Sequence, residues 1–351
     1  MPTIDHYQQV LQSVGEPFTV LPLQGDASVL ITRRGGRVLG LFPAPDADNL
    51  FWTSSAFESS AAFRAFIERK DGWHWNLGGD RTWIAPEFAY NARDRRNFSG
   101  TWTIPHDMDP GMYTITYTDG RIALTTEMML PVYHHGEMNG ETRLTLQKTI
   151  YAAPVVEESN GVISVGYVSE STLTQHGDAP IASHAWHLLQ VHPGGTLIIP
   201  VRGEFGAADY VAPVPVEARQ VVDGAVRLSI GGAGRFKVGY DAACMTGRMI
   251  YRQPMPDGRV ALLVREFEND PANPYLEEPP DSPGVGGHSV HVYNNGDDPA
   301  NDPSFGEMEC AGRTVGRATG HTSQTDTVTL SMFVGEATAI DRIIDALVRA
   351  S

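Results

Sequence analysis

The sequence is poor in cysteine and in positive charge. Only Cys244 and Cys310 occur in 351 residues, which provides neither a disulfide framework nor the ligand spacing of a zinc site. We expect both to be small buried apolar residues. Lys and Arg number 26 against 42 Asp and Glu, a formal net charge of -16. This balance argues against nucleic acid and anionic membrane surfaces as partners, because both attract basic patches.

Long apolar runs and leader features are also missing. No run approaches the roughly 18 apolar residues of a membrane span. Residues 1–18 contain neither the basic nor the apolar region of a signal peptide. We therefore expect a cytoplasmic protein, with a signal peptide removed from the chain as the alternative. Nucleophile-elbow, zinc-protease, phosphate-loop and dinucleotide-binding motifs do not occur either.

What the chain does contain is a long series of short strand-like runs. About seventeen apolar or alternating runs at this spacing predict a large all-β antiparallel sandwich. Nothing separates two domains, so we expect one domain over residues 1–351. The runs are 18–23, 28–33, 37–42, 113–118, 121–130, 142–152, 162–168, 185–191, 196–201, 216–222, 225–230, 235–240, 248–253, 259–267, 288–294, 306–311 and 326–334.

Turns and helices complete the predicted outline. Gly pairs and Asp-Gly pairs between runs predict hairpins at 119–120, 194–195, 223–224 and 257–258. Apolar residues at helical spacing predict peripheral helices near the two termini, at 4–14 and 337–349, and a weaker one at 57–69. The Pro- and Asx-rich segment 269–303 reads as two loops at one rim, where binding residues commonly lie.

The segment 73–87 is the most informative part of the chain. It places three Trp beside Arg81, Asp80 and Glu87, with two glycines before the strand-like residues. Trp faces stack on sugar rings, and charged side chains bind hydroxyl or carboxylate groups. We therefore predict Trp75, Arg81, Trp83 and Glu87 as saccharide-binding residues. The alternative is a strand end with core aromatics and a structural Arg81–Glu87 ion pair.

Two glutamates on one late strand are the strongest catalytic candidates. Because side chains alternate along a strand, Glu307 and Glu309 share one face, while Met308 and Cys310 face the core. Two carboxyl groups on a polar face can act as an acid–base pair. The alternative is an exposed polar face of an edge strand.

Two further segments offer polar faces. In the segment 183–192, read as a strand, one face carries His184, Trp186 and Gln190. We take His184 as a candidate catalytic acid and Trp186 and Gln190 as candidate saccharide-binding residues, with Trp186 stacking on the sugar. In the segment 286–297, one face carries three candidate binding residues, His291, Tyr293 and Asn295. The following Asn-Asn-Gly-Asp-Asp run could ligate calcium, but it lacks an ordered ligand spacing, so we favour a solvated turn and predict no metal or cofactor.

In order and spacing, these motifs resemble an uncharacterised bacterial family of the galactose-mutarotase-like superfamily, related to the aldose 1-epimerases. The resemblance covers roughly residues 18 to 334 and rests on five segments: Gly78 to Glu87, Trp186 to Gln190, Ile198 to Pro200, Val292 to Gly296, and Phe305 to Glu309. It implies a large antiparallel β-supersandwich that binds sugars in a polar groove on one sheet.

The resemblance also implies roles for named residues. Aldose 1-epimerases use a His as general acid and a Glu on a late strand as general base. Ser183-His184-Ala185-Trp186 loosely matches the motif of that His, with Ser in place of Asn, and Glu307 fits the Glu best.

The sequence thus predicts a carbohydrate-active enzyme working at or near the anomeric centre, of glycoside hydrolase or aldose 1-epimerase type. Glu307 would be the base or nucleophile, with Glu309 or His184 as partner. A mono- or oligosaccharide is the expected ligand, and the sequence leaves the oligomeric state open. The alternatives are a carbohydrate-binding module without turnover and a uronate-specific polysaccharide lyase in which Arg81 neutralises the uronate.

Overall fold

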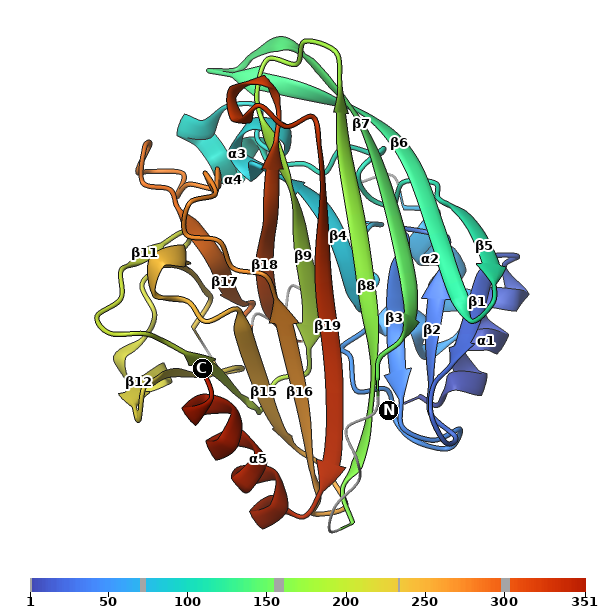
Figure 1. The fold of residues 1–351 in the computed structure, drawn as a ribbon. Helices are drawn as coiled ribbons and strands as arrows, with labels where there is room; N and C mark the ends of the chain where they lie inside the picture. Colours follow the sequence, from blue (N-terminus) through green and yellow to red (C-terminus); the bar gives the residue numbers. More distant parts are fainter. Residues whose placement is uncertain (1, 70–73, 155–160, 233, 298–303) are drawn as a thin grey trace.

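Two antiparallel sheets form the body of the protein in the computed structural model, which describes residues 2–69, 74–154, 161–232, 234–297 and 304–351 (Figure 1). The nine-stranded sheet has the order β1-β2-β3-β4-β9-β18-β17-β14-β11, and the ten-stranded sheet has the order β12-β13-β10-β15-β16-β19-β8-β7-β6-β5. The all-β sandwich predicted from the sequence is therefore confirmed.

The strands of the nine-stranded sheet are β1 (Phe18–Pro22), β2 (Ser28–Thr32), β3 (Arg37–Phe42), β4 (Asp80–Ala85), β9 (Ser183–Val191), β18 (Gly306–Val315), β17 (His288–Asn294), β14 (Phe236–Asp241) and β11 (Ala207–Asp209). Those of the ten-stranded sheet are β12 (Arg219–Val222), β13 (Ala225–Ser229), β10 (Thr196–Pro200), β15 (Arg248–Pro254), β16 (Val260–Phe267), β19 (Ser323–Gly335), β8 (Ile163–His176), β7 (Glu137–Ala152), β6 (Arg121–His134) and β5 (Thr114–Thr118).

Helices are few and peripheral. They are α1 (Ile4–Ser13), α2 (Ser60–Ile67), α3 (Glu87–Tyr90), α4 (Phe98–Thr101) and α5 (Ala337–Arg349), with short 3-10 turns η1 (Ser55–Glu58), η2 (Arg95–Asn97), η3 (Val216–Ala218), η4 (Ala242–Cys244) and η5 (Arg317–Thr319). Both predicted terminal helices are present. Among the described residues, no helix has the length and apolar character needed to cross a membrane.

The facing sides of the two sheets form the main hydrophobic core. Met308 on β18, Leu189 on β9 and Leu263 on β16 belong to the same buried cluster. Cys310 is buried and unpaired as expected, whereas Cys244 is only half-buried, and its thiol donates to the carbonyl of Glu204 at 2.9 Å. The expectation of a buried Cys244 was therefore wrong.

Helices cover the apolar parts of the outer sheet faces. α1 and α2 pack on Leu30, Leu39 and Phe42 of β2 and β3 in a second cluster. α5 packs on β10, β15 and β16 in a third, through Ile340 and Ile344 (Figure 1). The outer face of β4, β9, β18, β17 and β14 belongs to neither helical cluster, and this is where the polar side chains gather.

Three of the four predicted hairpin turns are hairpins. They connect β5 to β6, β12 to β13, and β15 to β16. The fourth prediction was wrong, because residues 194–195 lead from β9 in one sheet to β10 in the other.

The glycine pair before β4 has a steric role. Gly78 and Gly79 have φ of 89° and 78°, and a Cβ at Gly78 would collide with the carbonyl of Trp52. This close approach lets the backbone of Gly79 hydrogen-bond both Trp52 and Gln190, at 3.0 Å each. The turn therefore places the start of β4 against its neighbours.

Replacing Gly78 with Ala should destabilise the protein more than replacing Gly258 with Ala. Gly258 has a similar φ of 88° but open space around it. Its replacement therefore measures only the free-energy cost of placing alanine at a positive φ. We expect that cost to be about 1 kcal/mol at both sites, and the collision to add about 1–3 kcal/mol at Gly78 only. Urea unfolding of both variants would measure the difference, and equal losses would contradict the steric role.

Candidate functional site

The polar cluster lies on the outer face of five adjacent strands of the nine-stranded sheet. Register places Glu307 of β18 between Gln190 of β9 and Tyr293 of β17. Glu309, two residues on, stands beside His291 of β17. Since paired residues share a face, the polar faces predicted from three separate segments form one surface.

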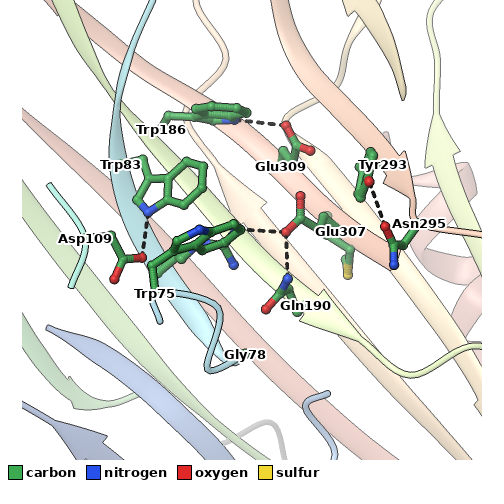
Figure 2. A network of polar contacts seen from close by, with 12 residues as sticks. Trp75, Gly78, Trp83, Asp109, Trp186, Gln190, Tyr293, Asn295, Glu307 and Glu309 are labelled. Carbon is green, nitrogen blue, oxygen red and sulfur yellow. Dashed lines mark hydrogen bonds and ion pairs between the residues drawn. The ribbon is translucent and has the colours of Figure 1, made fainter. Parts of the chain in front are cut away.

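Glu307 is held by two donors from different strands. Its Oε1 accepts hydrogen bonds from Arg81 Nη2 on β4 and from Gln190 Nε2 on β9, both at 2.9 Å. Figure 2 shows the contact between Gln190 and Glu307. The guanidinium is 2 % exposed, so the ion pair is largely shielded from water and from salt. The pair fixes the Glu307 carboxylate and balances its charge.

Glu309 lies deeper than Glu307 and has no solvent-exposed surface. Its Oε2 accepts a hydrogen bond from Trp186 Nε1 at 3.0 Å (Figure 2) and lies 3.6 Å from Lys237 Nζ. Burial raises the pKa of this carboxyl to about 8. The Lys237 charge opposes that rise, and the charges of Glu307 and Glu87 add to it. At neutral pH, Glu309 is therefore expected to be mostly protonated.

Lys237 on β14 is the second buried cation of the cluster. Its Nζ lies 3.2 Å from Glu87 Oε2 and 4.2 Å from the centre of the Trp186 ring. Burial lowers the pKa of this ammonium, but nearby carboxylates, led by Glu309 and Glu87, raise it more. Lys237 is therefore charged and paired at neutral pH.

Glu87 and Glu277 bring the number of carboxyl groups to four. Trp102 Nε1 donates to Glu87 Oε1 at 2.8 Å, and the backbone N–H of Glu87 donates to Glu277 Oε2 at 2.6 Å. Burial raises the pKa of Glu277 to about 8, and the Glu87 charge adds to the rise. The proposed alternative of an Arg81–Glu87 ion pair was wrong, because Arg81 pairs with Glu307 and Glu87 with Lys237.

The predicted saccharide-stacking tryptophans are buried. Trp75, Trp83 and Trp186 are each at most 6 % exposed, and the ring of Trp83 lies edge-on to the other two, at 5.1 and 5.9 Å between centroids. The guanidinium carbon of Arg81 lies 4.4 Å from the centre of the Trp83 ring. In this structure the indoles hold the charged groups, and stacking on a sugar stays a prediction. Trp73 lies outside the described residues.

His184 does not reach the two catalytic candidates. It pairs with Ala85 and Thr314, six positions along β9 from Gln190, which is about 20 Å at 3.3 Å per residue. Burial lowers its pKa to about 4, so the ring is neutral. The prediction that His184 serves as the acid partner of Glu307 is therefore not supported by the geometry.

The third predicted face lies at the edge of the cluster. Tyr293 OH donates to Asn295 Oδ1 at 2.8 Å (Figure 2), and Arg235 Nε donates to Tyr293 OH at 2.9 Å. His291 is fully buried, and burial together with the Lys237 charge holds its pKa well below the usual value. Tyr293 and His291 thus border Glu307 and Glu309, respectively, and Asn295 contacts the cluster through Tyr293.

Several buried polar atoms in the cluster have no hydrogen-bond partner among the described residues. They are Nε and Nη1 of Arg81, Oε1 of Gln190, Oε1 of Glu309, and both ring nitrogens of His291. Buried polar groups are nearly always paired, so a concentration of exceptions is typical of a place that receives a ligand or ordered water. The exceptions combine donors and acceptors, as a polyhydroxylated ligand requires.

Sequence reasoning missed Lys237, Glu277 and Tyr210. Lys237 sits on a predicted strand, but a single Lys there reads as solvent-exposed. Glu277 lies in the segment predicted to be a rim loop, and Tyr210 OH donates to its carbonyl at 3.0 Å. The alternation of Phe236, Lys237 and Val238 was the one local signal for Lys237.

A metal site has no support in the described part of the chain, where no group of three or more His, Cys, Asp or Glu is arranged to hold an ion. In the run considered for calcium, the side chains of Asn294 and Asn295 form hydrogen bonds with other protein groups. Residues 298–303 lie outside the described residues, so calcium binding by this run stays untested.

Comparison with known proteins identifies the fold. No protein-family model and no curated protein matches the chain. A candidate aldose 1-epimerase from Escherichia coli K12 matches with a TM-score of 0.50 and 11% identity, over 91% of this chain and 99% of that one. A second from Klebsiella pneumoniae matches with a TM-score of 0.51 and 10% identity, over 95% and 88%. The chain has the galactose-mutarotase-like fold that the resemblance implied.

The buried Glu309 should make stability depend on pH. Its pKa rises from 4.5 to about 8 on folding, so between these values the folded state binds a proton that the unfolded state has lost. Stability should therefore fall as pH rises through this window, by up to about 1.4 kcal/mol per pH unit for one proton.

Glu309→Gln should remove the Glu309 contribution to this dependence and reduce the slope, as measured by urea unfolding from pH 5 to 8.5. The parallel contribution of Glu277, whose pKa burial also raises to about 8, should remain. Glu141→Gln, at an exposed position on β7, is the matched control and should leave the slope unchanged. A Glu309→Gln slope equal to that of the wild type would show that Glu309 is ionised throughout.

Proposed function

We propose that the polar cluster binds a saccharide and catalyses acid–base chemistry at its anomeric carbon, with interconversion of the anomers of a free aldose as the reaction. The observation that carries this proposal is the contrast between Glu307 and Glu309. One carboxylate is paired with Arg81, and the other, two residues away on the same face, is buried with a raised pKa. Two carboxyl groups in such unequal environments are suited to the roles of base and acid.

The reaction needs one proton acceptor and one donor. Glu307 would take the proton from the anomeric hydroxyl while Glu309 gives one to the ring oxygen, and the bond between the anomeric carbon and the ring oxygen breaks. Rotation of the resulting aldehyde and closure on its other face, with both proton transfers reversed, gives the second anomer. No cofactor enters this scheme.

The fold supports a sugar as the ligand. The two solved structures compared above are described as candidate aldose 1-epimerases. The unpartnered atoms of Arg81, Gln190 and His291 offer donors and acceptors side by side, as recognition of sugar hydroxyls requires. Glycosidic bond cleavage uses a similar pair of carboxyl groups, so it is an outcome that the test below distinguishes.

A binding module without turnover is the second candidate. It is favoured by one observation, that Glu309 has no exposed surface while Glu307 keeps 7 %. Direct contact between Glu309 and a sugar therefore requires rotation of its side chain. If no rotation occurs, Glu307 alone would face the ligand and only accept hydrogen bonds.

Glu307→Gln should abolish anomer exchange while leaving the sugar bound, because it removes the base and retains a group of the same shape. We expect the exchange rate, measured by NMR at the anomeric protons of a panel of free aldoses, to fall about 10²- to 10⁴-fold. Glu309→Gln should also lose exchange, and Glu141→Gln should keep it.

The same spectra separate the alternatives. New reducing ends from an oligosaccharide would indicate a glycosidase, and unsaturated uronate signals a lyase. Broadened sugar resonances without any chemical change, in the wild type, would contradict turnover and support the binding module.

The charge of the cluster predicts a neutral ligand. Arg81 and Lys237, its two buried cations, already pair with Glu307, Glu87 and Glu309. A ligand carboxylate would add a negative charge to a place where cations are already matched, at a desolvation cost. We expect a hexuronate to bind at least about tenfold more weakly than the matching aldohexose, equivalent to about 1.4 kcal/mol. Titration calorimetry would check this, and tighter uronate binding would favour the lyase.

A further inference from the structure

A buried ion pair lies directly beneath the polar cluster, between the two sheets. Arg265 on β16 reaches across the interior, and its Nη2 donates to Asp80 Oδ1 on β4 at 2.9 Å. Tyr167 OH on β8 donates to the other oxygen of Asp80 at 2.6 Å. Arg265 is 1 % exposed and Asp80 is 7 % exposed. None of these three residues has a role in the acid–base scheme.

The same guanidinium also holds β18. Arg265 Nη1 donates to the carbonyl of Met308 at 2.8 Å. That carbonyl belongs to the peptide between Met308 and Glu309. The orientation of this peptide therefore affects the direction of the Glu309 side chain, which follows it, and of the Glu307 side chain, which precedes Met308. Asp80, the other partner of Arg265, directly precedes Arg81.

One side chain therefore connects the two strands that supply the central ion pair. β4 and β18 are not neighbours, because β9 lies between them. Arg81 and Glu307 must nevertheless meet above β9 at 2.9 Å. Arg265, from the opposite sheet, is bonded to the residue next to Arg81 and to the residue between the two glutamates.

Stability alone is a poor reason for such a pair. Burying two charges costs several kcal/mol of hydration, and well-packed apolar residues in their place often stabilise a protein as well or better. The surrounding core includes the apolar side chains of Leu189 and Leu263, together with the buried Lys148, whose ammonium interacts with the Asp80 charge. A forked, directional contact gives what apolar packing does not, namely a fixed relative position of two backbone segments.

We propose that Arg265 and Asp80 are positioning residues that set the alignment of Arg81, Glu307 and Glu309 from the interior. This inference rests on the proposed function for its catalytic consequence, but the alignment itself can be measured without any substrate.

The test uses R265K, which keeps the positive charge beside Asp80 but replaces the fork with a single ammonium. Arg248→Lys is the matched control, since Arg248 on β15 also forks onto a carboxylate, that of Glu266, and donates to a backbone carbonyl, that of Leu347, away from β4 and β18. Three quantities are compared in both variants and the wild type: urea stability, the titration midpoint of Glu309 from carboxyl carbon NMR, and anomer exchange. E309Q assigns the Glu309 signal.

We expect R265K to lower the exchange rate about tenfold or more, since small misplacements of reacting groups are costly, with KM within twofold of the wild type. We also expect the Glu309 midpoint to move by at least about half a pH unit, as its buried contacts with Trp186 and Lys237 loosen. Arg248→Lys should lose stability without either change. If R265K only loses stability, as Arg248→Lys does, the inference is overturned and the pair is structural.

Failure of the proposed function would look different. If the wild type exchanges no sugar, the titration of Glu309 alone tests the positioning role. An unchanged titration midpoint of Glu309 in R265K then overturns that role. Should R265K fail to fold, the double variant D80N/R265M removes both charges together. It is expected to fold and to show the same shift in the titration midpoint of Glu309, and an unchanged midpoint in that variant also overturns the inference.

Discussion

The Asp80-Arg81 dipeptide at the start of β4 is the point on which the site depends. Because side chains alternate along a strand, Asp80 points into the interior and Arg81 points to the outer face. Each meets an opposite charge from a distant part of the chain, Arg265 or Glu307. A shift of β4 by one residue would exchange the two faces and leave four buried charges unpaired. The glycine turn at residues 78–79 fixes where the strand begins.

Charge balance explains why the site holds protons. Four carboxyl groups gather around two buried cations, Arg81 and Lys237. If all four were ionised, the cluster would carry two uncompensated negative charges away from water, at a high cost. Burial raises the pKa of Glu309 and Glu277, and the neighbouring carboxylates add to the rise. Protonation of these two groups removes the excess negative charge. The acid of the proposed reaction is thus a product of burial.

Much of the fold could be predicted because strands show a local alternation of apolar and polar side chains in the sequence. Most strands coincide with predicted runs, and β18 has Glu307 and Glu309 on one face with Met308 on the other, as its sequence indicates. The sequence indicated β4 only in part, because this strand is buried along its whole length and contains Asp, Arg and Thr among its apolar residues, so it shows no regular alternation. β11, with three residues, and the four-residue helices α3 and α4 are too short to give a periodic signal.

The sequence could predict most of the residues that form the candidate site, but not which of them form hydrogen bonds and ion pairs with one another. Periodicity places a side chain on a face, and it carries no information about which strand lies alongside. Arg81 and Glu307 are 226 positions apart, so the nearby Glu87 seemed the natural partner of Arg81. For the same reason His184, on the correct face, proved to be too far along its strand to act with Glu307.

Two glutamates with the same covalent structure thus receive different chemistry from position alone. Glu307 lies where Arg81 and Gln190 both donate to one of its oxygens, which pairs this carboxyl group with a buried cation. Glu309 lies under the indole of Trp186, where burial favours the neutral form. The two environments are coupled, because the Glu307 charge adds to the effect of burial in keeping the proton on Glu309. The acid and the base are therefore properties of the pair, and a change at either residue is expected to alter both.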